Sequence, residues 1–232
     1  GFSRLRATAA LARAARRDGL PPGCDSVLVR PGAAGEAYLT VTLPKPDAAR
    51  FDPLDPAQLA ALAAAGRDAA EALLPWLRRQ PGFAGCRIDA YPRRAGIRET
   101  RRLRGLVEIG ASDVLEGRLR EDEVARPAWA LELWESPTRP RFEPVKGPCS
   151  VPLGALVSAS NPRLGMAGRC LSASHEALGA LRVLGTAMAT GEAIGIAAAL
   201  ASAADTTLAD VAPAKVRAER ETLASEAPAW RP

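Results

Sequence analysis

The chain has 232 residues, of which 47% are hydrophobic and 25% are charged, a composition that predicts a globular protein of one large or two small domains and excludes a disordered chain. Its 31 basic and 26 acidic residues leave a net charge of +5, which is too balanced for a dedicated nucleic-acid binder. Four separated cysteines and a single histidine supply few zinc ligands and no disulfide framework, so we expect a cytoplasmic protein without a metal site.

The N-terminal third is predicted to hold a helix, a hairpin and a second helix. Residues 1–20 are arginine-rich and amphipathic but lack the apolar core of a secretory signal, so we expect a surface helix rather than a transit peptide. Because the chain begins with glycine, we also expect a fragment or a processed piece. Two strands, residues 25–32 and 36–44, are joined by a Pro-Gly-Ala-Ala-Gly turn. A long helix should follow from the N-cap Asp55 and end or kink at Pro75.

The middle of the chain is predicted to be β-rich. Residues 86–94 and 97–110 are expected to form strands around a bend, followed by a short polar helix within residues 112–126. Residues 127–148 are punctuated by prolines and aromatic residues and are predicted to be irregular. A strand or a loop is expected over residues 149–158.

Small residues dominate the C-terminal third. A short buried strand is predicted over residues 164–168, then a loop with Ser172, Ser174, His175 and Glu176, then a helix from near Gly185. The start of that helix offers free backbone N–H groups and the positive end of the helix dipole, which suit an anion or an electron-rich carbonyl. The alternative is a tightly packed strand, loop and helix without a ligand.

Two further features of this third bear on its environment. Glycines at positions 179, 185, 191 and 195 leave room for a flat ligand or for close packing. No segment is expected to have the length and apolarity of a membrane span, and residues 184–204 come nearest. A last helix is predicted around residues 214–225.

Several motifs resemble one known family. Residues 161–201 read NPRLGMAGRCLSASHEALGALRVLGTAMATGEAIGIAAALA, and this run resembles the C-terminal signature of the FAD-dependent oxidoreductase family, among the glutathione-reductase-like flavoproteins. Further motifs of that family are similar, in the same order, to AGIRETRRLRG (95–105), PAWALELWE (127–135) and CSVPLGALV (149–157). The resemblance covers roughly residues 35–204.

The resemblance implies an α/β fold in three parts. A β-rich mixed-sheet substrate domain (residues 1–160) would precede the C-terminal strand-loop-helix part of a Rossmann-like FAD-binding domain (residues 161–204) and a C-terminal helix and tail (residues 205–232). The family's Gly-x-Gly-x-x-Gly unit, which holds the ADP part of FAD, is absent from this sequence. The chain is therefore expected to be a C-terminal portion that needs the N-terminal FAD-binding half of the same protein, is inactive alone and binds FAD weakly or not at all.

The cofactor contacts implied by the family lie at the end of the predicted strand, in the loop and at the helix start. There the helix N-terminus would stabilise the negative charge of a reduced flavin. The residues are Ala167, Gly168, Arg169, Cys170, Ser172, Leu184, Gly185, Thr186 and Ala187.

Three residues are candidates for catalysis, each with a structural alternative. His175 would take a proton from a substrate whose hydride goes to the flavin N5, or would only fix the loop. Arg98 would orient an anionic substrate group, or belong to an arginine ladder in which Glu99 neutralises one member. Arg182 would pair with a phosphate, a substrate carboxylate or Glu176, or form a structural ion pair.

The expected function is hydride transfer between a small organic substrate and flavin, with electrons passed to a further acceptor. The sequence identifies neither the substrate nor the acceptor nor the oligomeric state. Two other classes stay open: a non-catalytic arginine-rich binding module, and a structural fragment that packs on a partner chain. No nucleic-acid or membrane partner is expected.

Overall fold

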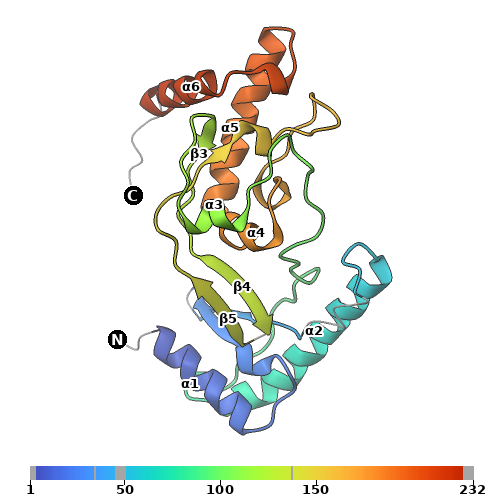
Figure 1. Cartoon of the computed structure of the whole chain (residues 1–232). Coiled ribbons are helices and arrows are strands. Elements are labelled where there is room, and N and C mark those ends of the chain that lie inside the picture. Colours follow the sequence, from blue (N-terminus) through green and yellow to red (C-terminus); the bar gives the residue numbers. More distant parts are fainter. Residues whose placement is uncertain (1–3, 34, 45–50, 137, 227–232) are drawn as a thin grey trace. The chain divides into compact units, whose positions relative to one another are not determined.

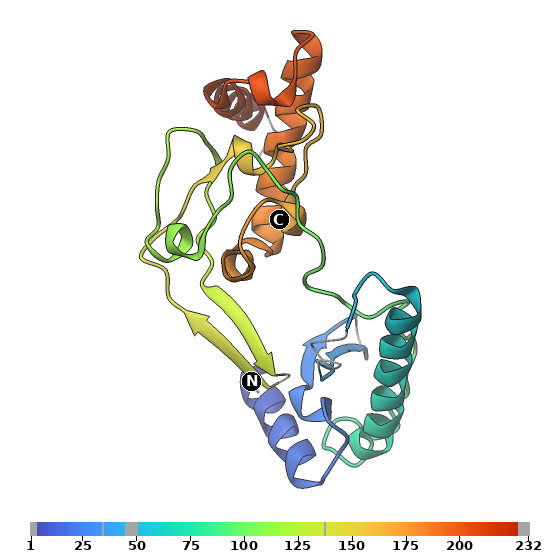
Figure 2. The same ribbon diagram turned by 45° about the vertical axis from the view of Figure 1, so that its right-hand side comes forward.

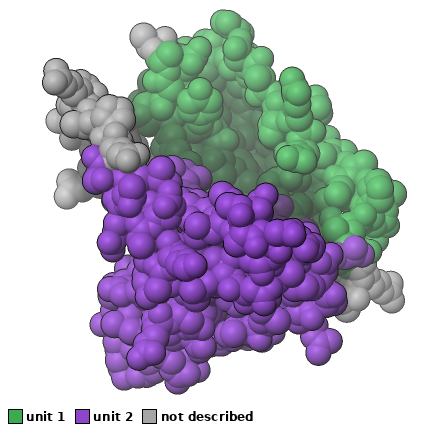
Figure 3. Space-filling model, turned by 90° about the horizontal axis from the view of Figure 1, so that it is seen from above, with its two compact units in different colours: residues 1–97, 134–140 green, residues 98–133, 141–232 purple. Residues whose placement is uncertain are grey.

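The computed structural model describes residues 4–33, 35–44, 51–136 and 138–226. Internal contacts divide the chain into two compact units, coloured separately in Figure 3. Unit 1 comprises residues 1–97 and 134–140, and unit 2 comprises residues 98–133 and 141–232. The domain boundaries expected at residues 160 and 204 stay predictions.

Unit 1 contains two helices and a hairpin (Figures 1 and 2). The helices are α1 (Arg4–Arg17) and α2 (Pro56–Leu77), and the hairpin pairs β1 (Leu28–Pro31) antiparallel with β2 (Ala37–Thr40). The predicted hairpin is therefore confirmed. A small core is formed by buried side chains from both helices and the segment between them, namely Leu11, Ala15, Cys24, Val27, Ala69, Leu73, Trp76 and Leu77.

The start of α2 follows the capping chemistry predicted from the sequence. The Asp55 carboxylate accepts a hydrogen bond from the Ala57 N–H at 2.8 Å, and the Gln58 side chain donates to the same carboxylate at 2.9 Å. These hydrogen bonds lower the pKa of Asp55 from its ordinary value, because they favour the ionised carboxyl group. The helix ends at Leu77, two residues after Pro75.

Unit 2 is built around α5 (Leu184–Ala203), which is flanked along the chain by α4 (His175–Leu181) and α6 (Pro213–Glu226) (Figure 1). It also contains α3 (Ala111–Leu115) and an antiparallel pair of short strands, β3 (Glu123–Ala125) and β6 (Val151–Pro152). Its core draws on all of these elements and includes Ile109, Val114, Val124, Val151, Leu156, Leu171, Leu181, Ala193, Ala197 and Val216.

A third two-stranded sheet, of β4 (Leu131–Ser136) and β5 (Arg139–Glu143), carries the chain from one unit into the other and back. The described residues thus form six α-helices and three small sheets, and the mixed α/β class is confirmed. The prediction that residues 127–148 are irregular is wrong. Pro140 lies within β5, which pairs on one side only in this two-stranded sheet, and proline is tolerated in such edge strands.

Three predicted strands are not formed. Residues 86–104 have no strand, and residues 105–110 make only isolated bridges, Gly105 with Ser158 and Ile109 with Ala173. The predicted strand over 164–168 is likewise reduced to one bridge, between Gly165 and Val157. In the segment 97–110, the N–H groups of Leu103, Leu106 and Ile109 donate to carbonyls about 50–70 residues further along the chain, which local residue patterns do not reveal.

Helix α5 consists mostly of apolar and small residues, with Glu192 as its only charged residue, and only one of its faces is buried. Thr190, Ala193 and Ala197 are completely buried, whereas the side chains of Leu184 and Met188 are 76% and 67% exposed. Among the described residues, α5 is long and apolar enough to cross a membrane by length and composition, so the expectation that no segment reaches that threshold is wrong. One such helix is weak evidence, because core helices of soluble proteins meet the same criterion. The expected absence of a membrane partner stays a prediction.

Two arginines of helix α6 form hydrogen bonds with other elements of unit 2. The Arg217 guanidinium donates to the Glu123 carbonyl at 2.8 Å. The Arg220 guanidinium donates to the carbonyls of Val124 and Ala189, each at 2.7 Å. These hydrogen bonds tie α6 to β3 and to α5 at the same time.

Two glycines in the helices of unit 2 should respond oppositely to alanine. A Cβ at Gly179 would lie 2.7 Å from the backbone oxygen of Glu132, so Gly179→Ala should lower the free energy of unfolding by about 1–3 kcal/mol. A Cβ at Gly191 meets nothing within 4 Å, so Gly191→Ala should raise it by about 0.5–1 kcal/mol. Urea denaturation followed by circular dichroism measures both changes, and equal effects of the two substitutions would contradict this packing.

Candidate functional site

The turn at Gly168 brings the predicted cofactor loop against α5. Gly168 has a φ of +62°, which favours glycine, and a Cβ there would lie 3.2 Å from the Cβ of Ala187. Its N–H donates to the Thr190 hydroxyl at 3.0 Å, and that hydroxyl donates to the Thr186 carbonyl at 2.7 Å. The close backbone approach predicted from the small residues is therefore made, at this glycine, to a helix of the chain itself.

The predicted loop, which was expected to continue to a helix start near Gly185, ends already at Ser174, because residues His175–Leu181 form helix α4. The side chain of Ser174 caps this helix by accepting a hydrogen bond from the Ala177 N–H at 3.2 Å. Ala177 and Leu178 are completely buried. The backbone that carries His175 is thus fixed by a cap and by the core of unit 2.

The arginine-rich segment, residues 95–110, lies beside this loop. The Leu103 N–H donates to the Cys170 carbonyl at 2.8 Å, and the Ile109 N–H donates to the Ser172 carbonyl at 3.1 Å. Earlier in the same segment, Glu99 Oε2 lies 2.7 Å from His175 Nδ1. Unit 2 therefore brings together two motifs that are 76 residues apart in the sequence.

The ion pair between Glu99 and Arg102 confirms that Glu99 neutralises one arginine of the motif. The expectation did not include the contact of Glu99 with His175. Its only signal in the sequence is a carboxylate placed directly after Arg98, and a spacing along the chain cannot show which distant residue a carboxylate meets.

Arg182 lies at the C-terminal end of α4, where it is half-buried. One of its Nη atoms donates to the backbone oxygen of Glu132 at 3.1 Å. Burial lowers the pKa of the Arg182 guanidinium from its ordinary value; the Glu132 carboxylate opposes this shift, and the positive charge of Arg98 adds to it. The positive charge of Arg98 thus acts on Arg182 within unit 2.

The N-terminus of α5 has no side-chain cap. Its N-cap residue is Val183, whose side chain contains no hydrogen-bond acceptor. The first intrahelical hydrogen bond runs from the Ala187 N–H to the backbone carbonyl of Val183 at 3.0 Å. The N–H groups of Leu184, Gly185 and Thr186 precede that bond. Leu184 and Gly185 are exposed, so this helix end can receive a negatively charged or electron-rich ligand group.

The predicted cofactor residues differ in accessibility. All lie in unit 2, where Arg169, Leu184 and Gly185 are exposed and Ala167, Cys170 and Ala187 are partly buried. Ser172 and Thr186 are only 2% and 4% exposed. Ser172 packs on Gly105, because a Cβ at that glycine would lie 2.7 Å from the Ser172 Cβ. Their assignment to FAD stays a prediction for every member of the set.

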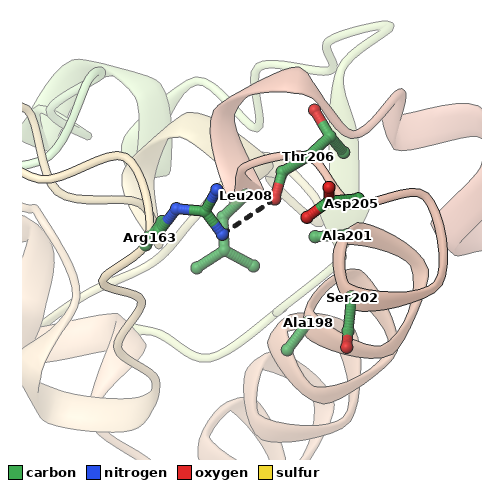
Figure 4. A pocket seen from close by; sticks show the side chains of 7 residues that line it. All are labelled: Arg163, Ala198, Ala201, Ser202, Asp205, Thr206 and Leu208. Atoms are coloured by element: carbon green, nitrogen blue, oxygen red, sulfur yellow. Dashed lines mark hydrogen bonds between the residues drawn. The ribbon is translucent and has the colours of Figure 1, made fainter.

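A surface pocket lies at the opposite end of α5 (Figure 4). It has a volume of about 230 Å³ and includes Ser202, Asp205 and Leu208 in its lining. The Arg163 guanidinium crosses it and donates to the Thr206 carbonyl at 3.4 Å (Figure 4). None of the predicted site residues lines this pocket, so it is separate from the candidate site.

Comparison with protein families gives one match. The model described as FAD dependent oxidoreductase matches residues 13–219, most of the chain. Neither the curated proteins nor the solved structures contain a significant match.

The Thr190 hydroxyl provides a test of how the Gly168 turn is held. Thr190→Val keeps the side-chain shape but leaves the Gly168 N–H without its acceptor, so the free energy of unfolding should fall by about 1–3 kcal/mol. Thr222→Val on the exposed face of α6 is the matched control and should change it by less than about 0.5 kcal/mol. Chemical denaturation measures both values. Equal stability of Thr190→Val and the wild-type chain would show that the turn does not depend on this hydrogen bond.

Proposed function

Because the chain belongs to the FAD dependent oxidoreductase family, we propose that it is the C-terminal portion of a glutathione-reductase-like flavoprotein that transfers a hydride between a small organic substrate and flavin. FAD is the cofactor of this family. The observation that carries the proposal is the uncapped N-terminus of α5, set against the Gly168 turn. We also propose a cytoplasmic location and a substrate-bearing N-terminal part, residues 1–160.

The residues at this place fit the cofactor. The N–H groups of residues 184–186 supply hydrogen-bond donors at the positive end of a helix dipole, which stabilises negative charge on a bound group. The exposed Gly185 has nothing within 4 Å of a Cβ position, which leaves room for a planar ring. Ala167, Gly168, Arg169, Cys170 and Ser172 would line the approach from the loop side, and Ala187 the helix side. The flavin, when bound, supplies the hydride acceptor.

The proposed chemistry also uses three side chains of unit 2. His175, at the exposed start of α4, would hold the proton that leaves the substrate. Arg98 and Arg182, which both lie in unit 2, would orient an anionic group of the substrate through their guanidinium groups. The electrons taken from the substrate would go on to a further acceptor.

The missing half of the site is proposed to cover the outer face of α5. An apolar helix is normally buried on all sides, yet Leu184 and Met188 are largely exposed. Gly191 and Gly195 have nothing within 4 Å of their Cβ positions among the described residues, and glycines within a helix destabilise it by about 1 kcal/mol each relative to alanine. A surface that approaches the helix closely would offset that cost. We propose that the Gly-x-Gly-x-x-Gly half of the same protein provides it.

A titration with FAD tests this division of the site. The 232-residue chain should bind FAD weakly or not at all, whereas the product of the complete gene should be yellow and retain flavin. Flavin fluorescence and absorbance measure both. Tight, stoichiometric binding of FAD by the 232-residue chain alone would contradict the proposal that half of the site is missing from this chain. A colourless complete protein without the glycine motif would overturn the proposal, and salt-sensitive retention on DNA would favour an arginine-rich binding module.

A charged residue on the exposed face of α5 tests whether another part of the protein docks there, without disturbing the fold of this chain. Met188→Glu should leave the isolated chain folded, because the side chain is 67% exposed there. In the complete protein it should reduce flavin content by tenfold or more, on the order expected for burial of an unpaired charge. Leu223→Glu on the exposed side of α6 is the control and should retain flavin. Normal flavin content in Met188→Glu would show that nothing covers this face.

A further inference from the structure

Glu99 has no role in the proposed function, and the structure assigns one. We infer that Glu99 is a positioning residue: it fixes the tautomer of His175 so that Nδ1 carries the hydrogen and Nε2 is the nitrogen that receives a proton. The catalytic meaning of this inference rests on the proposed function, but the tautomer itself does not.

The geometry of the pair determines which nitrogen is protonated. Glu99 Oε2 lies 2.7 Å from His175 Nδ1, a hydrogen-bond distance. An ionised carboxylate accepts hydrogen bonds and donates none. Nδ1 must therefore donate, and a neutral imidazole whose Nδ1 carries the hydrogen has its lone pair on Nε2.

Glu99 is itself held from two directions. Its other carboxylate oxygen, Oε1, forms an ion pair with Arg102, so the two oxygens have separate partners. The backbone of the segment is tied to the loop before α4 by the hydrogen bond from Leu103 to Cys170. The carboxylate is thus oriented before any ligand arrives.

The histidine is anchored on one side and open on the other. The side chain of Glu99 is 21% exposed, whereas that of His175 is 62% exposed. The described residues form no hydrogen bond with Nε2 of His175. Nε2 is therefore the nitrogen that the Glu99 contact leaves both unprotonated and without a partner among the described residues.

The consequence for a reaction is a defined direction of proton transfer. An O–H or N–H bond of the substrate breaks, the proton forms an N–H bond at Nε2, and the electron pair stays on the substrate heteroatom. The imidazolium so formed has its Nδ1–H directed at the Glu99 carboxylate, which stabilises the positive charge. The adjacent hydride is accepted by the cofactor of the proposed function.

A purely structural reading of the same contact is that Glu99 only ties its segment to α4. The two readings differ in what they demand of the ring. A purely structural contact could form with Nδ1 as the donor or as the acceptor. The inference requires that Nδ1 carries the hydrogen and that Nε2 is reactive.

The chain's single histidine makes the tautomer directly measurable. We would label the 232-residue chain with ¹⁵N-histidine and record long-range ¹H–¹⁵N spectra under mildly alkaline conditions. The wild-type ring should be protonated at Nδ1. In Glu99→Ala the population should shift to the Nε2–H form, which free imidazole favours in water, while Glu176→Gln, a neighbouring carboxylate with no hydrogen bond to the ring, should resemble wild type.

Reactivity provides the second measurement. Diethyl pyrocarbonate acylates an unprotonated imidazole nitrogen, so His175 in the wild-type chain should react at Nε2. Glu99→Ala should react about threefold or more slowly, because it lacks the carboxylate that stabilises charge developing on the ring. Glu176→Gln should react at the wild-type rate. Circular dichroism establishes that each variant is folded.

The outcomes separate this inference from the proposed function. A wild-type ring protonated at Nε2 would overturn it, and that spectrum needs no variant, so it decides even where Glu99→Ala does not fold. Unchanged tautomer and reactivity in a folded Glu99→Ala would also overturn it. A complete protein that binds no flavin would refute the proposed function and leave the tautomer result intact.

Discussion

The hydrogen bond from the Gly168 amide to the Thr190 hydroxyl lies where the loop and α5 of unit 2 meet. Both groups are buried, so each needs a partner inside the protein. The left-handed conformation of Gly168 is what allows its N–H to point at the helix. The positions of Cys170 and Ser172, and through them of the arginine-rich segment, follow from this one junction, because both residues accept backbone hydrogen bonds from that segment.

Local chemistry made part of the fold predictable. The N-cap Asp55 and the turn between β1 and β2 act within a few residues, and both were recognised from the sequence. The strand predicted over residues 97–110 does not form. The prediction used the local pattern of residue types, which does not show that the backbone hydrogen bonds of this segment go to residues far along the chain. Helix α4 was missed for a different reason. Ser174 is a favourable N-cap, but the helix of seven residues is too short for a clear apolar periodicity.

The sequence predicted which residues belong to the candidate site better than it predicted which of them are in contact. The family motifs named His175, Arg98 and Arg182, and the fold places all three in unit 2. The contact of Glu99 with His175 joins two motifs that no local rule connects. Burial could not be foreseen either: Ser172 is surrounded by core, because a small polar residue in a loop motif carries no signal of the depth at which it will lie.

The two arginines of α6 have a consequence for association. Among the described residues, β3 has a strand partner on one side only, β6, and an edge strand with free carbonyls is a template to which further chains can add. Arg217 and Arg220 occupy the carbonyls of Glu123 and Val124 with charged, bulky groups. An incoming strand would have to displace both guanidinium groups before it could pair. The C-terminal helix therefore covers part of this strand edge with charged groups, one of the ways in which proteins keep an edge strand from pairing with another chain.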